Sequence, residues 1–163
     1  MLNRTLRKTS IAAFVLTLAA ALPAMGQASA SRGSVRVTVG YGMQYLDEPW
    51  RTAIGGSVRF QVFRRFSVEP EFMSSRGPRF NQWTFIPNVV VDLRGPEKKV
   101  TPYFIGGVGY FRDFDKSINY KRSEIGWGGG FGARVRLGGG LFVSPEFRLG
   151  HITRVAVGIG YQF

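Results

Sequence analysis

The 163-residue sequence predicts an all-β fold in which eight antiparallel strands close into an up-and-down barrel. Apolar and polar side chains alternate with a period of two, which is typical of strands with two unlike faces and not of helices. The alternation recurs in eight segments, and turn-forming residues separate them. These segments are roughly 34–45, 52–63, 66–73, 83–93, 101–111, 125–137, 141–150 and 154–163.

The first thirty residues have the features of a secretory signal peptide. Arg4, Arg7 and Lys8 precede the apolar run 11–22, and the segment Ala28-Ser29-Ala30 offers the small residues that signal peptidase accepts. An apolar run of this length spans about 18 Å as a helix, which is short of a hydrocarbon core of about 30 Å. We therefore expect residues 1–30 to be removed, after Ala30 or Ala28, and residues 31–163 to form one domain.

The composition excludes several kinds of functional site. The chain has no cysteine, so it has no disulfide, thiolate metal site or cysteine nucleophile, and its one histidine does not suggest a metal centre. The glycine strings at 106–109 and 128–130 fall within predicted strands and precede no helix, which argues against a phosphate-binding loop. We expect no cofactor. The net charge of +12 could suit nucleic acid, but an export signal argues against that partner.

One face of the predicted sheet carries no charge in any of the eight segments, and the other face is polar. A soluble sandwich or lipocalin-like barrel would turn the apolar face inward, whereas an outer-membrane barrel turns it toward lipid. Near-balanced charge on the polar face and glycines at 126, 128, 130 and 132 suit a narrow closed interior with room for arginine side chains. Aromatic residues near the strand ends also suit a membrane interface: Tyr45, Trp50, Trp83, Tyr110 and Trp127. We therefore predict a transmembrane barrel.

Three prolines lie within predicted strands. Pro70, Pro87 and Pro145 have no backbone N–H to donate to a neighbouring strand. We expect a local bulge at each of them.

An internal repeat relates residues 56–72 to residues 131–147 at an offset of 75, and each copy ends in Val-x-Pro-Glu-Phe. If the two hairpin turns centre on Arg65 and Gly140, Arg59 faces Glu71 and Arg134 faces Glu146 across the ladder. The repeat therefore predicts two inward ion pairs at equivalent heights.

Charged residues on the polar face predict an ion-pair network that fills the interior, because eight strands enclose just enough room for side chains. An ion path or an acid/base pair is the functional alternative. The predicted members are Arg36, Arg59, Glu69, Glu71, Asp92, Arg134, Arg136, Glu146 and Arg148.

In the last nine residues, 155–163, large apolar or aromatic side chains occupy every second position, counted back from a terminal phenylalanine. This segment resembles the C-terminal strand of bacterial outer-membrane proteins. Together with residues 101–110 and 144–148, it makes the sequence similar to the outer-membrane β-barrel domain family of the OmpA, OmpX and OmpW type. The resemblance implies a place in the bacterial outer membrane and recognition by the barrel-assembly machinery through the last strand. The residues that it assigns to this signal are Val157, Ile159, Tyr161 and Phe163.

We expect a monomeric protein with a structural or surface-interaction role in the envelope and no enzymatic activity. The first alternative is a narrow pore for ions or small solutes. The second is modification of lipid A, because lipid A deacylases resemble this chain in placing a His-x-Ser motif near the end. Here the motif is His151-Ile152-Thr153, with threonine in place of the serine, and no acidic residue follows Glu146.

The predicted outer loops are net basic and would lie level with lipopolysaccharide phosphates, which accept charge-assisted hydrogen bonds from Arg and Lys. The loop cations include Arg51, Arg112, Lys116 and Arg154. We expect four others to contact lipopolysaccharide: Arg76, Arg79, Lys121 and Arg122. Solvated loop charges without a ligand are the alternative.

Overall fold

A computed structural model describes residues 33–43, 50–77, 80–95, 97–115 and 120–163. The predicted signal peptide, Tyr45 and Arg79 lie outside the described residues. Within those ranges, no helix is long and apolar enough to cross a membrane.

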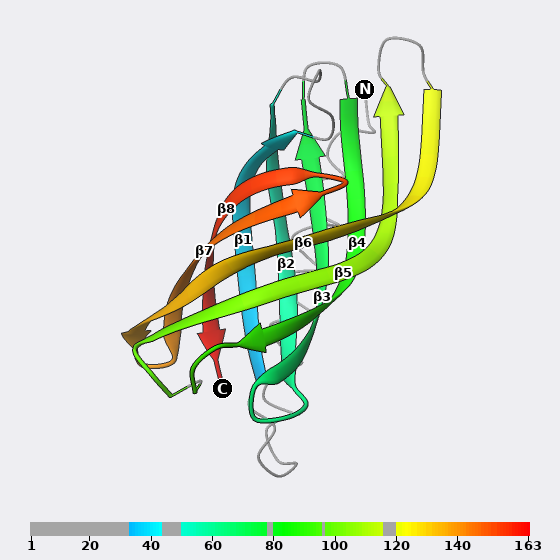
Figure 1. The fold of residues 1–163 in the computed structure, drawn as a ribbon. Helices are drawn as coiled ribbons and strands as arrows, with labels where there is room; N and C mark the ends of the chain where they lie inside the picture. The colour runs from blue at the N-terminus through cyan, green and yellow to red at the C-terminus, as the bar shows by residue number, and fades with distance from the viewer. Residues whose placement is uncertain (1–32, 44–49, 78–79, 96, 116–119) are drawn as a thin grey trace. The chain divides into compact units, whose positions relative to one another are not determined.

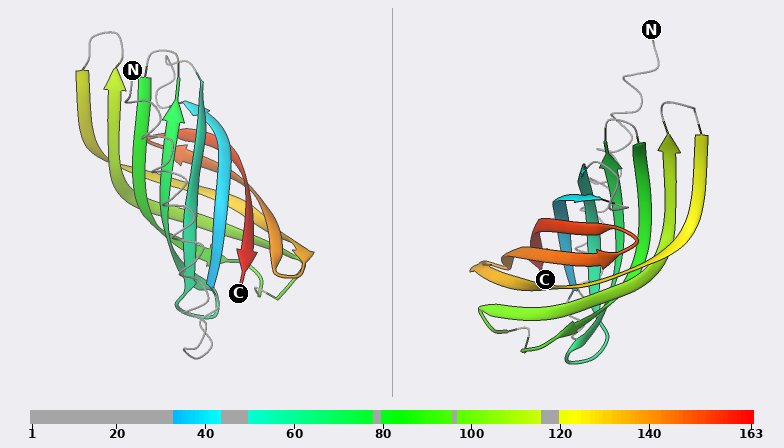
Figure 2. Two further views of the ribbon diagram at one scale, coloured as in Figure 1. Left: turned by 180° about the vertical axis from the view of Figure 1, so that it is seen from behind. Right: turned by 45° about the horizontal axis from the view of Figure 1, so that its top comes forward.

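Eight antiparallel strands form a closed barrel in which each strand pairs with its neighbours along the chain and β1 pairs with β8. This confirms the predicted fold (Figures 1 and 2). The strands are β1 Gly33–Met43, β2 Arg51–Gln61, β3 Phe66–Arg76, β4 Phe80–Asp92, β5 Val100–Asp115, β6 Tyr120–Gly138, β7 Leu141–Gly150 and β8 Thr153–Gln162.

The two ends of the barrel differ in their connections. We call the end that carries the C-terminus the turn end, since the links β2–β3, β4–β5 and β6–β7 lie there, and we call the opposite end the loop end. Towards the loop end, β5 and β6 extend further than predicted, to Asp115 and from Tyr120. Polar residues interrupt the alternation there, but the ladder continues, with Asp113 opposite Arg122.

The apolar face of the sheet looks outward. In β1, Val37 and Val39 are 55% and 52% exposed, whereas Arg36 and Thr38, which alternate with them, are buried. Among the described residues, 30 large hydrophobic side chains are exposed, and the buried set contains 21 polar or charged residues against 9 hydrophobic ones. A soluble barrel would show the opposite arrangement, because it must remove apolar surface from water. The outward face therefore fits lipid.

The expected bulges at the prolines are absent from the described ladders. Pro70 lies opposite Pro87, and the β3–β4 register is unchanged on both sides of them. Beside Pro145, Gly132 faces Glu146 and Val135 faces Val143, which is again one register. The flanking pairs hold the strands in place, so a lost proline donor costs a hydrogen bond without adding a residue. The register shift in β6–β7 lies instead between Arg136 and Gly138.

Candidate functional site

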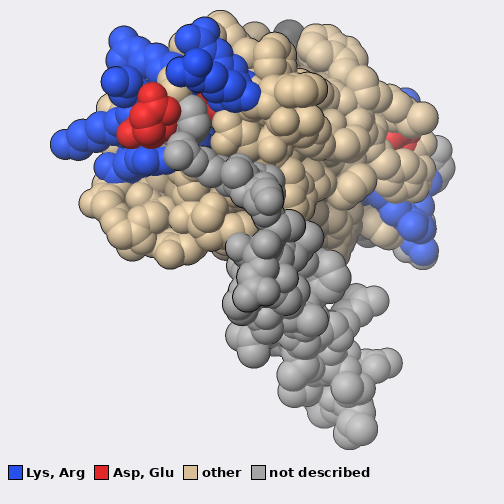
Figure 3. All heavy atoms as spheres, turned by 90° about the horizontal axis from the view of Figure 1, so that it is seen from below, with Lys and Arg blue, Asp and Glu red and all other residues tan. Residues whose placement is uncertain are grey.

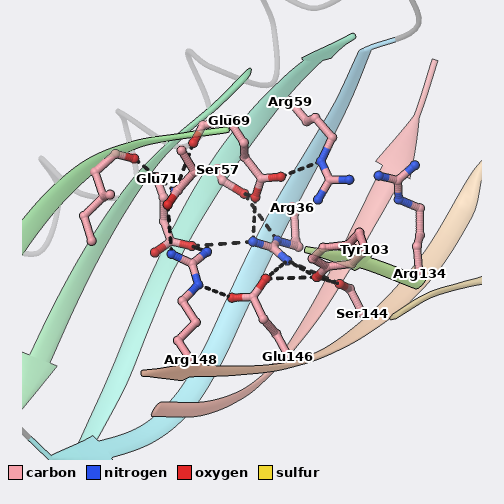
Figure 4. Close-up of polar contacts among 12 residues, drawn as sticks. Arg36, Ser57, Arg59, Glu69, Glu71, Tyr103, Arg134, Ser144, Glu146 and Arg148 are labelled. Carbon is pink, nitrogen blue, oxygen red and sulfur yellow. Dashed lines mark hydrogen bonds and ion pairs between the residues drawn. The ribbon is translucent and has the colours of Figure 1, made fainter. Parts of the chain in front are cut away.

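A buried network of charged side chains occupies the barrel interior, and Arg36 of β1 lies at its centre (Figure 4). Its guanidinium donates to Glu69 Oε1 at 2.5 Å and to Glu146 Oε2 at 2.9 Å. It also donates to Tyr103 Oη at 3.1 Å and to Ser144 Oγ at 3.2 Å. Because these partners belong to β3, β5 and β7, one side chain links strands on several sides of the interior.

The two glutamates of the repeated Val-x-Pro-Glu-Phe motif share their arginine partners. Arg148 contacts Glu71 at 2.8 Å and Glu146 at 2.6 Å. Arg154 contacts the same two carboxylates at 2.9 and 3.4 Å. Arg36 contacts Glu146 at 2.9 Å and Glu71 at 3.5 Å, so three guanidiniums surround the two carboxylates. Buried carboxylates need such partners because burial removes their hydration.

The predicted pairing of Arg59 with Glu71 is wrong. Ser57 lies opposite Glu71 and Phe60 opposite Val68, so Arg59 lies level with Glu69. The turn centres one residue earlier than predicted, because Val62 N and Phe63 N both donate to the Phe66 carbonyl. Arg59 Nε donates to Glu69 Oε2 at 2.5 Å, and Arg59 Nη1 lies 3.4 Å from Asp92 Oδ1.

The predicted pairing of Arg134 with Glu146 is also wrong. Glu146 lies opposite Gly132, because β6 and β7 are joined by a tight turn through Gly139 and Gly140. These two glycines have φ values of +59° and +83°, which other residues rarely adopt. The acid that Arg134 reaches is Asp92, with Nη2 and Oδ1 separated by 3.8 Å.

Small residues make room for the crossing side chains. A Cβ at Gly132 would lie 2.6 Å from Tyr103 Oη, and one at Gly158 would lie 2.5 Å from Arg36 Cδ. Gly158, which makes room for Arg36, is in β8. In β6, where we expected such a glycine, Gly132 makes room for Tyr103, and Gly126 faces His151 and Phe111.

Eight of the nine predicted network residues are buried in the interior. The exception is Arg136, which is half-buried near the turn end, where its Nη2 donates to Gln162 Oε1 at 2.7 Å. The eight are Arg36, Arg59, Glu69, Glu71, Asp92, Arg134, Glu146 and Arg148.

Several polar residues beyond the nine predicted ones join the network. Asn88 donates to the Glu69 carbonyl and accepts from Arg148 at 3.1 Å. Tyr103 Oη donates to Glu146 Oε2 at 2.9 Å. Arg154 was expected in an outer loop but is buried, and Arg51 is buried as well. Arg154 lies on the face of its strand opposite to Val155 and Val157, and this alternation could have placed it inside.

A cavity of about 10 Å³ lies towards the loop end, which is about the space that one water molecule needs. Its lining residues are Gly42, Met43, Arg51, Ala53, Ser75, Gln82, Ile152 and Arg154.

A second polar cluster lies at the loop end. His151 Nε2 is 2.7 Å from Glu124 Oε1, and the His151 ring packs on Phe111 with the centroids 4.4 Å apart. We expected no acid to partner this histidine because none follows Glu146 in the chain. That expectation is wrong, since Glu124 reaches it from the neighbouring strand β6. Arg122 pairs with the same carboxylate at 2.9 Å.

Comparisons with known proteins agree with this architecture. The family model described as "Outer membrane protein beta-barrel domain" matches residues 14–163. No curated protein matches the sequence. The N-terminal barrel domain of Pseudomonas aeruginosa OprF has a TM-score of 0.69 at 10% identity, covering 81% of this chain and 97% of that one.

Two further solved structures share the fold. Neisserial surface protein A has a TM-score of 0.65 at 10% identity, covering 82% of this chain and 97% of its own. Pseudomonas aeruginosa OprG has a TM-score of 0.58 at 14% identity, covering 82% and 96%. The inward network, the outward apolar face and the family match lead to one conclusion: the chain belongs to the outer membrane protein beta-barrel domain family and resides in the bacterial outer membrane.

Proposed function

We propose that this protein is a closed, monomeric barrel with a structural role in the outer membrane and no enzymatic activity. The observation that supports the proposal is the set of contacts across the interior. Arg36 on β1 donates to Tyr103 on β5 and to Glu146 on β7. Tyr103 also forms hydrogen bonds with Ser144 and with Glu146. Ions and solutes would have to break these buried bonds to pass.

Planar-bilayer recordings test this proposal against the narrow-pore alternative. Protein purified from outer membranes should give no stable single-channel steps. A double variant, Arg36→Ser with Glu146→Ser, removes one positive and one negative charge together and should give such steps. Val37→Ser with Val39→Ser, on the outward face, serves as the matched control and should stay silent. Stable steps from the unsubstituted protein would favour the pore.

Contact with lipopolysaccharide at the loop end is part of the proposed role. By the family's topology the short turns face the periplasm, so the loop end faces outward. Arg76, Lys121 and Arg122 are exposed there, whereas Arg79 lies outside the described residues. Replacing these four residues with glutamine should reduce the lipopolysaccharide that co-purifies with the barrel. Unchanged retention would mean that the loop charges are merely solvated.

The contact between His151 and Glu124 favours hydrolysis of a lipid acyl chain as a second candidate function. The pair supplies a base and an acid that orients it, and Thr153 would have to act as the nucleophile. Mass analysis of lipid A separates the two candidates. A structural barrel leaves the acyl count unchanged when the protein is expressed, whereas an enzyme lowers it, and His151→Ala abolishes that change.

A further inference from the structure

Five exposed cations gather in two neighbouring turns at the turn end. Arg64 and Arg65 lie in the β2–β3 turn, and Arg94, Lys98 and Lys99 lie in the β4–β5 turn. We call these five residues the basic turn patch. Figure 3, which looks onto this end, shows Lys and Arg side chains gathered beside an acidic one. Glu97 is the only acidic residue between Gln61 and Phe66 or between Asp92 and Val100.

Backbone hydrogen bonds hold the two turns beside each other. Asp92 N donates to the Arg65 carbonyl at 2.8 Å, which joins the first turn to the start of the second. At the far side of the second turn, Arg136 N donates to the Lys99 carbonyl at 2.9 Å. The cations of the two turns therefore lie at neighbouring positions along the same edge of the barrel.

Within the described part of the chain, no ion pair neutralises this patch. The salt bridges among the described residues lie in the barrel interior, except for those that join Glu124 to Arg122 and to His151. At the loop end, the described residues include four exposed cations and three acids. The cations are Arg76, Arg112, Lys121 and Arg122, and the acids are Asp113, Asp115 and Glu124. With Arg51 and Arg154 inside the barrel, the larger positive surplus of the described residues lies at the turn end.

Exposed apolar side chains border the patch directly. Phe63 is 69% exposed at the tip of the β2–β3 turn, and Phe66 and Leu93 are exposed beside Arg65 and Arg94. A residue advances the chain by about 3.3 Å, so the charges lie within several ångströms of the apolar band. Long cationic side chains in this position keep their stems on the apolar surface and place their charged ends at headgroup level.

We propose that the basic turn patch binds the headgroups of anionic phospholipids in the periplasmic leaflet of the outer membrane. Lipid phosphates accept charge-assisted hydrogen bonds from Arg and Lys, and an anionic leaflet attracts such cations. An acidic protein or a cell-wall polymer would need charges that project away from the membrane. The adjacent Phe63 and Leu93 hold these charges at the membrane surface, which favours lipid headgroups over the other two ligands.

Native mass spectrometry of the detergent-solubilised protein tests the proposal with phosphatidylglycerol and phosphatidylethanolamine of identical acyl chains. The turn variant carries glutamine at Arg64, Arg65, Lys98 and Lys99. A matched loop variant carries glutamine at Arg76, Arg112, Lys121 and Arg122, so each variant loses four positive charges. Heat-modifiable electrophoretic mobility verifies that both variants fold.

The unsubstituted protein and the loop variant should prefer phosphatidylglycerol by about tenfold or more, and the turn variant should lose most of that preference. The proposal would be overturned if the turn variant kept the full preference for phosphatidylglycerol, or if both variants lost that preference to the same extent. So would an unsubstituted protein that binds purified peptidoglycan but shows no lipid preference. None of these outcomes depends on whether the barrel conducts.

Discussion

Glu71 and Glu146 hold the same place in the two copies of the repeated hairpin, and both accept from Arg154 Nη2, at 2.9 and 3.4 Å. Their strands, β3 and β7, lie four apart in a closed ring of eight, so the carboxylates meet from opposite sides of the interior. Each faces a small residue, Ser57 or Gly132, across its own hairpin. The repeat thus delivers two carboxylates to one shared cluster of guanidiniums.

Removing one carboxylate from this cluster should destabilise the barrel strongly. Glu146→Gln leaves Arg36, Arg148 and Arg154 buried with less compensating charge, and breaking a buried pair in this way costs about 3–5 kcal/mol. Urea unfolding in lipid vesicles measures the loss. Glu97→Gln, at an exposed turn position, is the control and should change the free energy of unfolding by less than about 0.5 kcal/mol. Similar losses for both variants would contradict the assignment.

The observed register of β2 and β3 predicts which glutamate couples to Arg59. A double-mutant cycle of Arg59→Gln with Glu69→Gln should give a coupling energy of about 1 kcal/mol or more. The same cycle with Glu71→Gln should give a clearly smaller value, because Arg36, Arg148 and Arg154 surround Glu71 instead. A larger coupling energy with Glu71 than with Glu69 would instead support the pairing expected from the sequence.

Gly158 should tolerate no side chain. An alanine Cβ there would lie 2.5 Å from Arg36 Cδ and 2.8 Å from its Cγ, and Arg36 cannot move without losing its ion pairs. We expect Gly158→Ala to cost about 1–3 kcal/mol of unfolding free energy, as overpacking commonly does. At Gly106 the nearest atom would be 3.6 Å away, so Gly106→Ala should be nearly neutral. Equal tolerance at both positions would place Arg36 elsewhere.

Phe163 should matter more for assembly in cells than for the folded barrel itself. Its backbone exchanges hydrogen bonds with Gly33, at 3.0 and 3.2 Å, which Phe163→Ala retains. If the barrel-assembly machinery reads the terminal side chain, this variant accumulates less in the outer membrane but refolds normally into vesicles. Phe66→Ala, also exposed near the turn end, is the control. Equal loss for both variants in cells would argue against a terminal signal.

The sequence by itself determined the number of strands and the direction that each face looks. Both follow from local alternation, since a strand surrounded by lipid must present apolar residues outward at every second position. By the same logic Arg36, Glu69 and Glu146 fall on the inward face, and all three are buried. This logic misplaced Arg154 because the residue lies at the start of its strand, where the sequence also suggested a loop.

Only the tertiary structure decided which inward charges meet. A shift of two residues keeps every side chain on the same face, so alternation cannot distinguish Arg59 opposite Glu69 from Arg59 opposite Glu71. The turns set that register, and closure of the barrel then brings β1, β3 and β7 together around Arg36. The contact between His151 and Glu124 has the same origin: the pairing of β6 with its neighbours joins residues that lie far apart in the chain.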